Sequence, residues 1–108
     1  MQKSKAESYI GFCIKSGKLT CGFNAVSVQK KGVYLLILCA SASENARAEA
    51  IKLKNKFNCE IIIVRGKTLE EVTGKPNVKL AAVRDTGLAN AILSSADENF
   101  EIYSGGNR

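Results

Sequence analysis

The fold is decided by residues Val33–Ala40, Val-Tyr-Leu-Leu-Ile-Leu-Cys-Ala, a nearly continuous apolar run of strand length. Because both faces of such a run are apolar, it is typical of a central strand that is covered on both sides. A second run of the same kind, Cys59–Val64, predicts another buried strand. Shorter strands are predicted at Leu19–Cys21 and Leu80–Val83, which gives a mixed or mostly parallel sheet of about four strands.

Helical patterns lie between these strands. Ser41 and Glu44 have the spacing of a capping box with Ser41 as the N-cap, and Thr68 and Glu71 have the same spacing. Asn24 is the predicted N-cap of another helix, since asparagine side chains accept hydrogen bonds from the free N–H groups there. The predicted helices lie at residues 3–16, at about 25–31, after Ser41–Glu44, after Thr68–Glu71 up to Gly74, and from Asp85 or Thr86 to about Ser95.

This alternation of strands and helices defines the predicted fold class. It is typical of α/β proteins in which helices cover both faces of the sheet, so the sequence predicts a three-layer α/β/α sandwich. The chain of 108 residues suffices for one hydrophobic core but not for two ordinary domains. We therefore predict a single domain over residues 1–103 and a flexible tail over residues 104–108.

The net charge is +6, and the positive charge is concentrated away from the C-terminus. Residues 1–40 carry +5, residues 41–84 carry +4 and residues 85–108 carry −3. A basic domain of this kind is predisposed to bind nucleic acid or an anionic surface. The same charge would also keep a small protein soluble, so composition alone leaves both explanations open.

The chain has four cysteines and no histidine. Because the cysteines are widely spaced, with no C-x-x-C pair, we predict no metal site and interpret them as small thiols in a reducing compartment. No apolar run resembles a signal peptide or reaches membrane-spanning length. We therefore predict a cytoplasmic protein with no membrane partner and no cofactor.

The segment Ser16–Asn24, Ser-Gly-Lys-Leu-Thr-Cys-Gly-Phe-Asn, is the predicted binding edge. Gly17 ends the first predicted helix, and Gly22 allows the backbone to approach a partner closely. Lys15 and Lys18 add positive charge. Backbone donors, an amide and ammonium groups suit a polyanion better than a small apolar ligand.

No catalytic site is predicted. Histidine, the commonest general base, is absent, and no serine or cysteine has an obvious base beside it. Gly66-Lys67-Thr68 follows a predicted strand as a phosphate-binding P-loop would, but position 61 holds Ile where that motif requires Gly. It is therefore interpreted as a turn.

Five short motifs, taken together, resemble a known family. They are Gly11–Leu19, Gly22–Asn24, Leu35–Asn45, Leu69–Lys75 and Ala82–Ala89. In their order and spacing they resemble the kink-turn RNA-binding ribosomal proteins L-seven-Ae and L-thirty-e, and especially their bacterial YlxQ-type paralogues. The resemblance covers about residues 8–95.

The resemblance implies that two loops at one end of the sandwich bind a sharply bent RNA helix. Gly22–Asn24 matches the family's recognition loop, which contacts sheared G·A pairs, and Leu69–Lys75 matches a second loop with apolar contacts. Position 25 is alanine, where the kink-turn binders carry an acidic residue. With the nearby lysines, the candidate RNA-binding residues are Lys15, Gly17, Lys18, Gly22, Phe23, Asn24, Lys30, Lys31, Leu69, Val72, Gly74 and Lys75.

These observations predict a non-catalytic RNA-binding protein of ribosomal-protein type. Its expected partner is a kinked or otherwise structured RNA helix, for example in ribosomal RNA, and we expect a monomer that does not bind DNA. Two alternatives stay open. The chain could be a protein-interaction module that docks an acidic partner through its basic face, or an accessory domain of an RNA-modifying enzyme.

Overall fold

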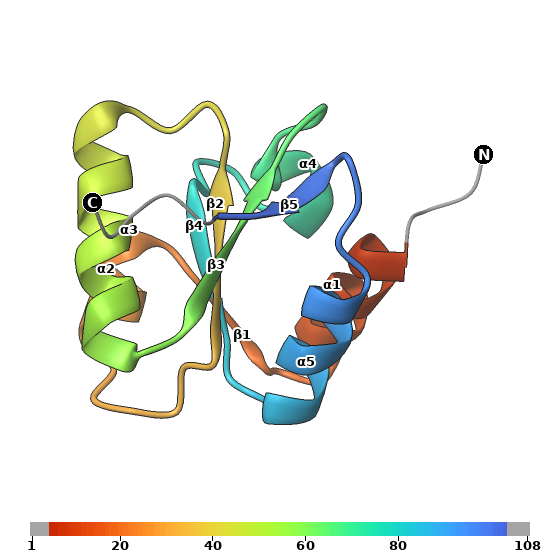
Figure 1. Ribbon diagram of the computed structural model, residues 1–108, viewed down its shortest axis with the longest axis horizontal. Helices are drawn as coiled ribbons and strands as arrows, with labels where there is room; N and C mark the ends of the chain where they lie inside the picture. Colours follow the sequence, from red (N-terminus) through yellow and green to blue (C-terminus); the bar gives the residue numbers. More distant parts are fainter. Residues whose placement is uncertain (1–4, 104–108) are drawn as a thin grey trace.

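The computed structural model describes residues 5–103. The predicted start of the first helix at residues 3–4 and the predicted tail at residues 104–108 therefore lie outside the described residues. Figure 1 shows helices packed on both sides of a twisted sheet. In chain order, the elements are α1 (Lys5–Lys15), β1 (Leu19–Cys21), α2 (Phe23–Ser27), β2 (Leu35–Cys39), α3 (Glu44–Phe57), β3 (Glu60–Val64), α4 (Leu69–Thr73), β4 (Leu80–Val83), α5 (Thr86–Ser94) and β5 (Phe100–Ile102).

The five strands form one mixed sheet in the order β1-β4-β2-β3-β5. β2 and β3 are parallel, whereas the other neighbouring pairs are antiparallel. In this register Leu36 of β2 lies opposite Ile61 of β3 and Ala82 of β4. The most apolar run of the sequence is therefore the middle strand, as expected for a strand covered on both faces.

Helices cover both faces of this sheet (Figure 1), with α1, α4 and α5 on one face and α2 and α3 on the other. Successive residues of a strand point to opposite faces, so each central strand contributes to two cores. Leu35 and Ile37 pack beneath α1, α4 and α5, whereas Leu36 and Leu38 pack beneath α2 and α3. The structure thus confirms the predicted three-layer α/β/α sandwich.

One of the two predicted capping boxes is confirmed. At the start of α4, the Glu71 N–H donates to Thr68 Oγ1 (3.1 Å), and the Thr68 N–H donates to Glu71 Oε1 (2.7 Å). The prediction that Ser41 caps α3 is wrong. Ser43 is the N-cap, and its Oγ accepts from the Ala46 N–H at 3.1 Å, because the turn after β2 takes two more residues than predicted.

The helix predicted over residues 25–31 starts earlier and is shorter. α2 spans Phe23–Ser27 with Gly22 as its N-cap, so the predicted N-cap Asn24 lies within the first turn instead. Val28 is the C-cap and is 71% exposed, and Val26 is the only buried residue of this helix, so the apolar stripe that would support a longer helix is missing. Gly32, at φ 87°, belongs to the following loop and not to a helix end.

The sheet has five strands where the sequence predicted about four. The additional strand, β5, pairs antiparallel with the edge of β3. The prediction missed it because this strand is only three residues long and buries only Phe100, within a polar and acidic stretch. Within residues 5–103, no helix is both long enough and apolar enough to cross a membrane.

Candidate nucleic-acid interface

The candidate residues lie at two opposite ends of the sheet. The upper end, as oriented in Figure 1, is where β2 and β3 finish and β4 begins. β1 is drawn lower in this view and runs in the same direction as β2. The lower end is where β1, β2 and β3 begin and β4 finishes. Strand β1 leads from the lower end towards the upper end, so residues on either side of it are separated in space although they are neighbours in the chain.

At the upper end, the first predicted loop is hydrogen-bonded to the strand that follows the second. The Gly22 N–H donates to the carbonyl oxygen of Leu80 at 2.8 Å, which fixes the β1–α2 turn against the start of β4. The segment that leads into β4 is residues 74–79, directly after α4. Burial raises the pKa of the Cys21 thiol, and the positive charge of Lys75 partly opposes this shift. Lys75 therefore lies close enough to Cys21 of β1 to interact with it electrostatically.

Three of the predicted contact residues are wholly or partly buried. Leu69 is fully buried in the core beneath α1, α4 and α5, so it is not available to a ligand. Phe23 and Val72 are half-buried and pack against the two cores, which leaves each of them only partly accessible. Asn24, Gly74 and Lys75 are exposed at this end.

A polar network lies beside these exposed residues. Lys79 Nζ lies 3.4 Å from Glu70 Oε2 and 3.3 Å from Ser41 Oγ, and Ser41 Oγ lies 3.1 Å from Cys39 Sγ. Burial disfavours the Cys39 thiolate, but hydrogen bonds with Ser41 and with the Leu69 backbone, together with the charge of Lys79, outweigh it, so the net effect lowers the pKa of the thiol. Because Cys39 is only 1% exposed, we assign this network a structural role.

Lys75 is the cation of the upper end that remains available. Lys79 is paired with Glu70, whereas Lys75 has no ion-pair partner in the part of the chain that the structure describes. Asn77 stands beside it with φ 58°, a left-handed conformation that asparagine tolerates better than most residues. Asn77 was not among the predicted site residues, although the Pro76-Asn77 pair is a typical turn signal.

The remaining candidates lie at the lower end. Gly17 and Lys18 precede β1, and the Arg84 side chain donates from Nη2 to the Gly17 carbonyl oxygen at 3.0 Å. Lys30 and Lys31 lie in the loop before β2. Lys15 lies in the last turn of α1, which covers one face of the sheet. The single edge predicted over Ser16–Asn24 is therefore divided between both ends.

Gly22 is the residue whose conformation the upper end depends on most directly. Its φ of 97° and ψ of 146° lie in a region that is essentially limited to glycine, and a Cβ there would meet no atom within 4 Å. We expect Gly22→Ala to lower the free energy of unfolding by about 1–3 kcal/mol, from backbone strain alone. Urea denaturation measures this change.

Gly11→Ala is the matched control, because Gly11 lies within α1 and an added Cβ would likewise meet no atom within 4 Å. This replacement should leave stability unchanged or raise it by up to about 1 kcal/mol, because alanine favours the helix. Equal losses in the two variants would show that the conformation of Gly22 is not the cause.

Comparisons with known proteins were made by sequence and by structure. No family model matches the chain, and no curated protein sequence matches it. A solved structure, described as a protein with unknown function from Bacillus halodurans C, has a TM-score of 0.71 and 20% sequence identity. The similarity covers 85% of this chain and 96% of that one. It supports the fold alone. Within residues 5–103, no three potential metal ligands of the His, Cys, Asp and Glu types lie together.

Proposed function

We propose that the protein binds a sharply bent or otherwise structured RNA helix through its upper end, without catalysing a reaction. The observation that carries this proposal is the hydrogen bond from the Gly22 N–H to the Leu80 carbonyl oxygen at 2.8 Å. It holds the first of the two predicted RNA-binding loops against the start of β4, the strand that follows the second.

The open backbone at this end suits RNA. A Cβ added at Gly22 or Gly74 would meet no atom within 4 Å, so the space beside each glycine is open to a partner. Structured RNA is recognised largely through its shape, its backbone and its exposed base edges. In this proposal the glycines permit close approach, the Asn24 amide reads base edges, and the Lys75 ammonium contacts a phosphate.

A cytoplasmic location is part of the same proposal. All four cysteines are unpaired, and two of them, Cys13 and Cys39, are buried. Burial, together with the nearby charge of Asp85, raises the pKa of Cys13 to about 11, so this thiol is protonated at neutral pH. Unpaired cysteines are typical of a reducing compartment such as the cytoplasm.

Replacing Lys75 with alanine tests the proposal. We expect weaker binding to a blunt-ended bent RNA, and a salt dependence whose slope falls by about one, because one phosphate contact is lost. Fluorescence anisotropy titrations at several salt concentrations measure both quantities.

Lys18→Ala is the charge-matched control, since Lys18 is also exposed but lies at the lower end. It should change the affinity for the same blunt-ended RNA much less than Lys75→Ala does. If the two variants lose affinity equally, binding follows net charge and not the upper end, and the proposal is wrong.

A further inference from the structure

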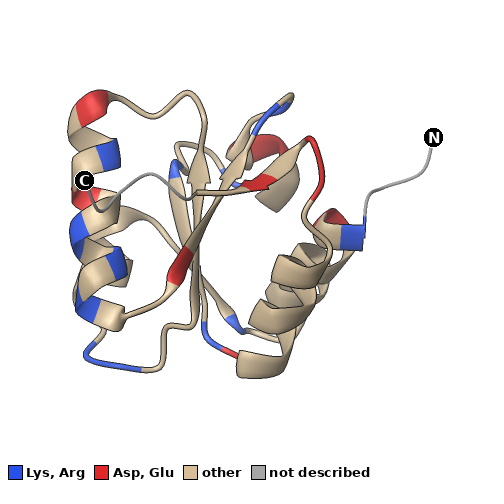
Figure 2. Cartoon of the chain, viewed as in Figure 1, with Lys and Arg blue, Asp and Glu red and all other residues tan. Residues whose placement is uncertain are grey.

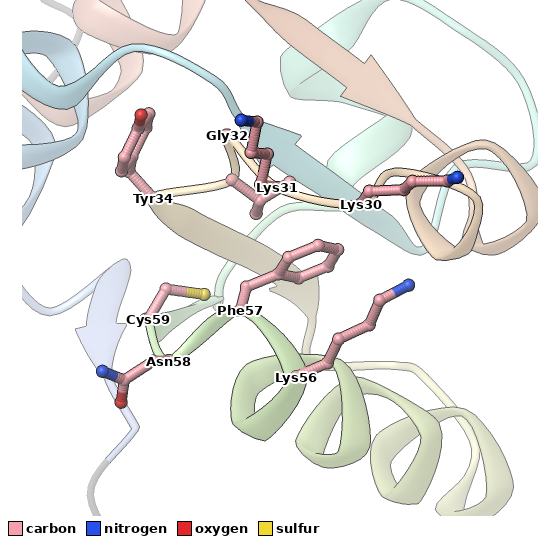
Figure 3. Close-up of a pocket in the computed structure, with 9 residues that line it drawn as sticks. Lys30, Lys31, Gly32, Tyr34, Lys56, Phe57, Asn58 and Cys59 are labelled. Carbon is pink, nitrogen blue, oxygen red and sulfur yellow. The ribbon is translucent and has the colours of Figure 1, made fainter.

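A pocket of about 330 Å³ lies at the lower end, away from the site proposed above. It is formed by the loop before β2, residues 30–34, and by the turn between α3 and β3, residues 56–59 (Figure 3). The backbone of each wall is fixed by its neighbouring elements. Asn58 adopts φ 54° as the C-cap of α3, and the Tyr34 N–H donates to the Val83 carbonyl oxygen at 2.9 Å.

The pocket is lined by lysines without acidic partners. Lys30, Lys31 and Lys56 line it, and no Asp or Glu is among its lining residues. Within residues 5–103, Lys30 and Lys31 have no ion-pair partner, while Lys56 Nζ donates to the Ser27 carbonyl oxygen at 2.8 Å. An anion bound over this pocket would be attracted by three ammonium groups and would meet no carboxylate among the lining side chains.

Further basic groups surround the pocket. In Figure 2 the basic segments gather along α3 and the lower end, whereas several acidic segments lie over the upper half. Lys18 and Arg84 belong to this end and are joined by a hydrogen bond from the Arg84 N–H to the Lys18 carbonyl oxygen, at 2.8 Å. Because positive charge extends beyond the pocket, this surface suits an anion that is longer than the pocket.

Aromatic rings lie next to the ammonium groups. Tyr34 is 43% exposed at the rim, although it directly precedes the fully buried strand β2. The Phe57 ring lies between the lysines of the two walls in Figure 3, with Lys56 Nζ 5.1 Å from its centre. Exposed aromatic rings beside basic groups are typical of surfaces that stack the bases of single-stranded nucleic acids.

We propose that this lower-end pocket binds a nucleotide of a single-stranded RNA segment. Lys30, Lys31 and Lys56 hold the backbone phosphates, and the exposed ring of Tyr34 stacks on a base. The pocket volume is at the small end of the range for ligand sites, which suits one nucleotide and not a folded helix. An acidic peptide would satisfy the lysines but would leave the exposed ring of Tyr34 without a stacking partner.

Binding at this pocket can be tested separately from binding at the upper end. The probe is a labelled, unstructured octamer of uridine, titrated against the full chain by fluorescence anisotropy. We expect Tyr34→Ala to weaken binding about tenfold, as for other bases stacked on aromatic side chains, and Tyr34→Phe to retain the affinity. The double variant K30A/K31A should lower the slope of the salt dependence by about 1.4, for two phosphate contacts on a single strand.

The double variant K5A/R65A is the matched control, because it removes the same charge from two exposed basic side chains that do not line the pocket and do not lie on α3. It should bind the octamer nearly as the unmodified protein does. An equal loss in K5A/R65A, or full affinity in Tyr34→Ala, would overturn the proposal. So would tighter binding of polyglutamate than of the octamer, or competition by uridine monophosphate as effective as by the octamer itself.

Discussion

Phe100→Ala should lower the free energy of unfolding by about 3–5 kcal/mol, the usual cost of removing a large buried aromatic side chain. Phe100 is fully buried and lies in the core beneath α1, α4 and α5. It is also the only buried residue of β5, so its removal leaves this edge strand with little to hold it on β3. A domain of this size has only about 5–15 kcal/mol of stability, and urea denaturation followed by circular dichroism would show the loss.

Ile102→Ala is the matched control in the same strand. Ile102 is 40% exposed, so its replacement should cost much less than that of Phe100. If Phe100→Ala does not fold, Phe100→Leu keeps most of the buried volume and should give a smaller, measurable loss. Equal losses at Phe100 and Ile102 would contradict the placement of Phe100 in the core.

Asn24→Ala should weaken binding to a bent RNA about 5- to 150-fold, which corresponds to about 1–3 kcal/mol for one good amide contact to base edges. Asn24 is exposed in the first turn of α2, and alanine is acceptable in a helix. We therefore expect stability to stay nearly unchanged while RNA binding falls. Parallel titrations with a bent RNA and thermal unfolding of the variant separate the two effects.

Asn90→Ala is the matched control, because it makes the same chemical change at an exposed position on α5. Asn90 belongs to neither of the two candidate sites. This variant should bind the bent RNA as the unmodified protein does. An Asn24→Ala variant with full affinity for the bent RNA would remove Asn24 from the proposed interface.

Local patterns in the sequence were sufficient to predict most of the fold. The apolar run of β2 and the capping box at Thr68 fixed the position and type of their elements, because both depend on residues close in the chain. The start of α3 and both ends of α2 were misplaced, and β5 was missed altogether. Its pairing with β3 links residues far apart in the chain, and only Phe100 marks it, so tertiary packing rather than local preference forms this strand.

The candidate site was predictable in its segments but not in its grouping. The Gly22 N–H bonds to Leu80 at the start of β4, so the first predicted loop lies beside the strand that follows the second, and their joint binding of RNA stays a prediction. Lys18 and Gly22 are close in the sequence, yet β1 carries the chain from the lower end to the upper end between them. The basic pocket was not predicted as a site, because its two walls come from separate loops that only the folded chain brings together.

The most direct test of the central claim is a titration of the unmodified protein against two blunt-ended RNAs of equal length. One carries a sharp bend with sheared G·A pairs, and the other is a straight duplex. Each is measured at two salt concentrations, so that shape recognition can be separated from the charge-dependent part of binding.

If the upper end recognises RNA shape, the bent RNA binds more tightly, and this preference persists at the higher salt concentration. Equal and steeply salt-dependent affinity for both RNAs would contradict recognition of a bent helix, and would leave only the attraction of a basic domain for a polyanion.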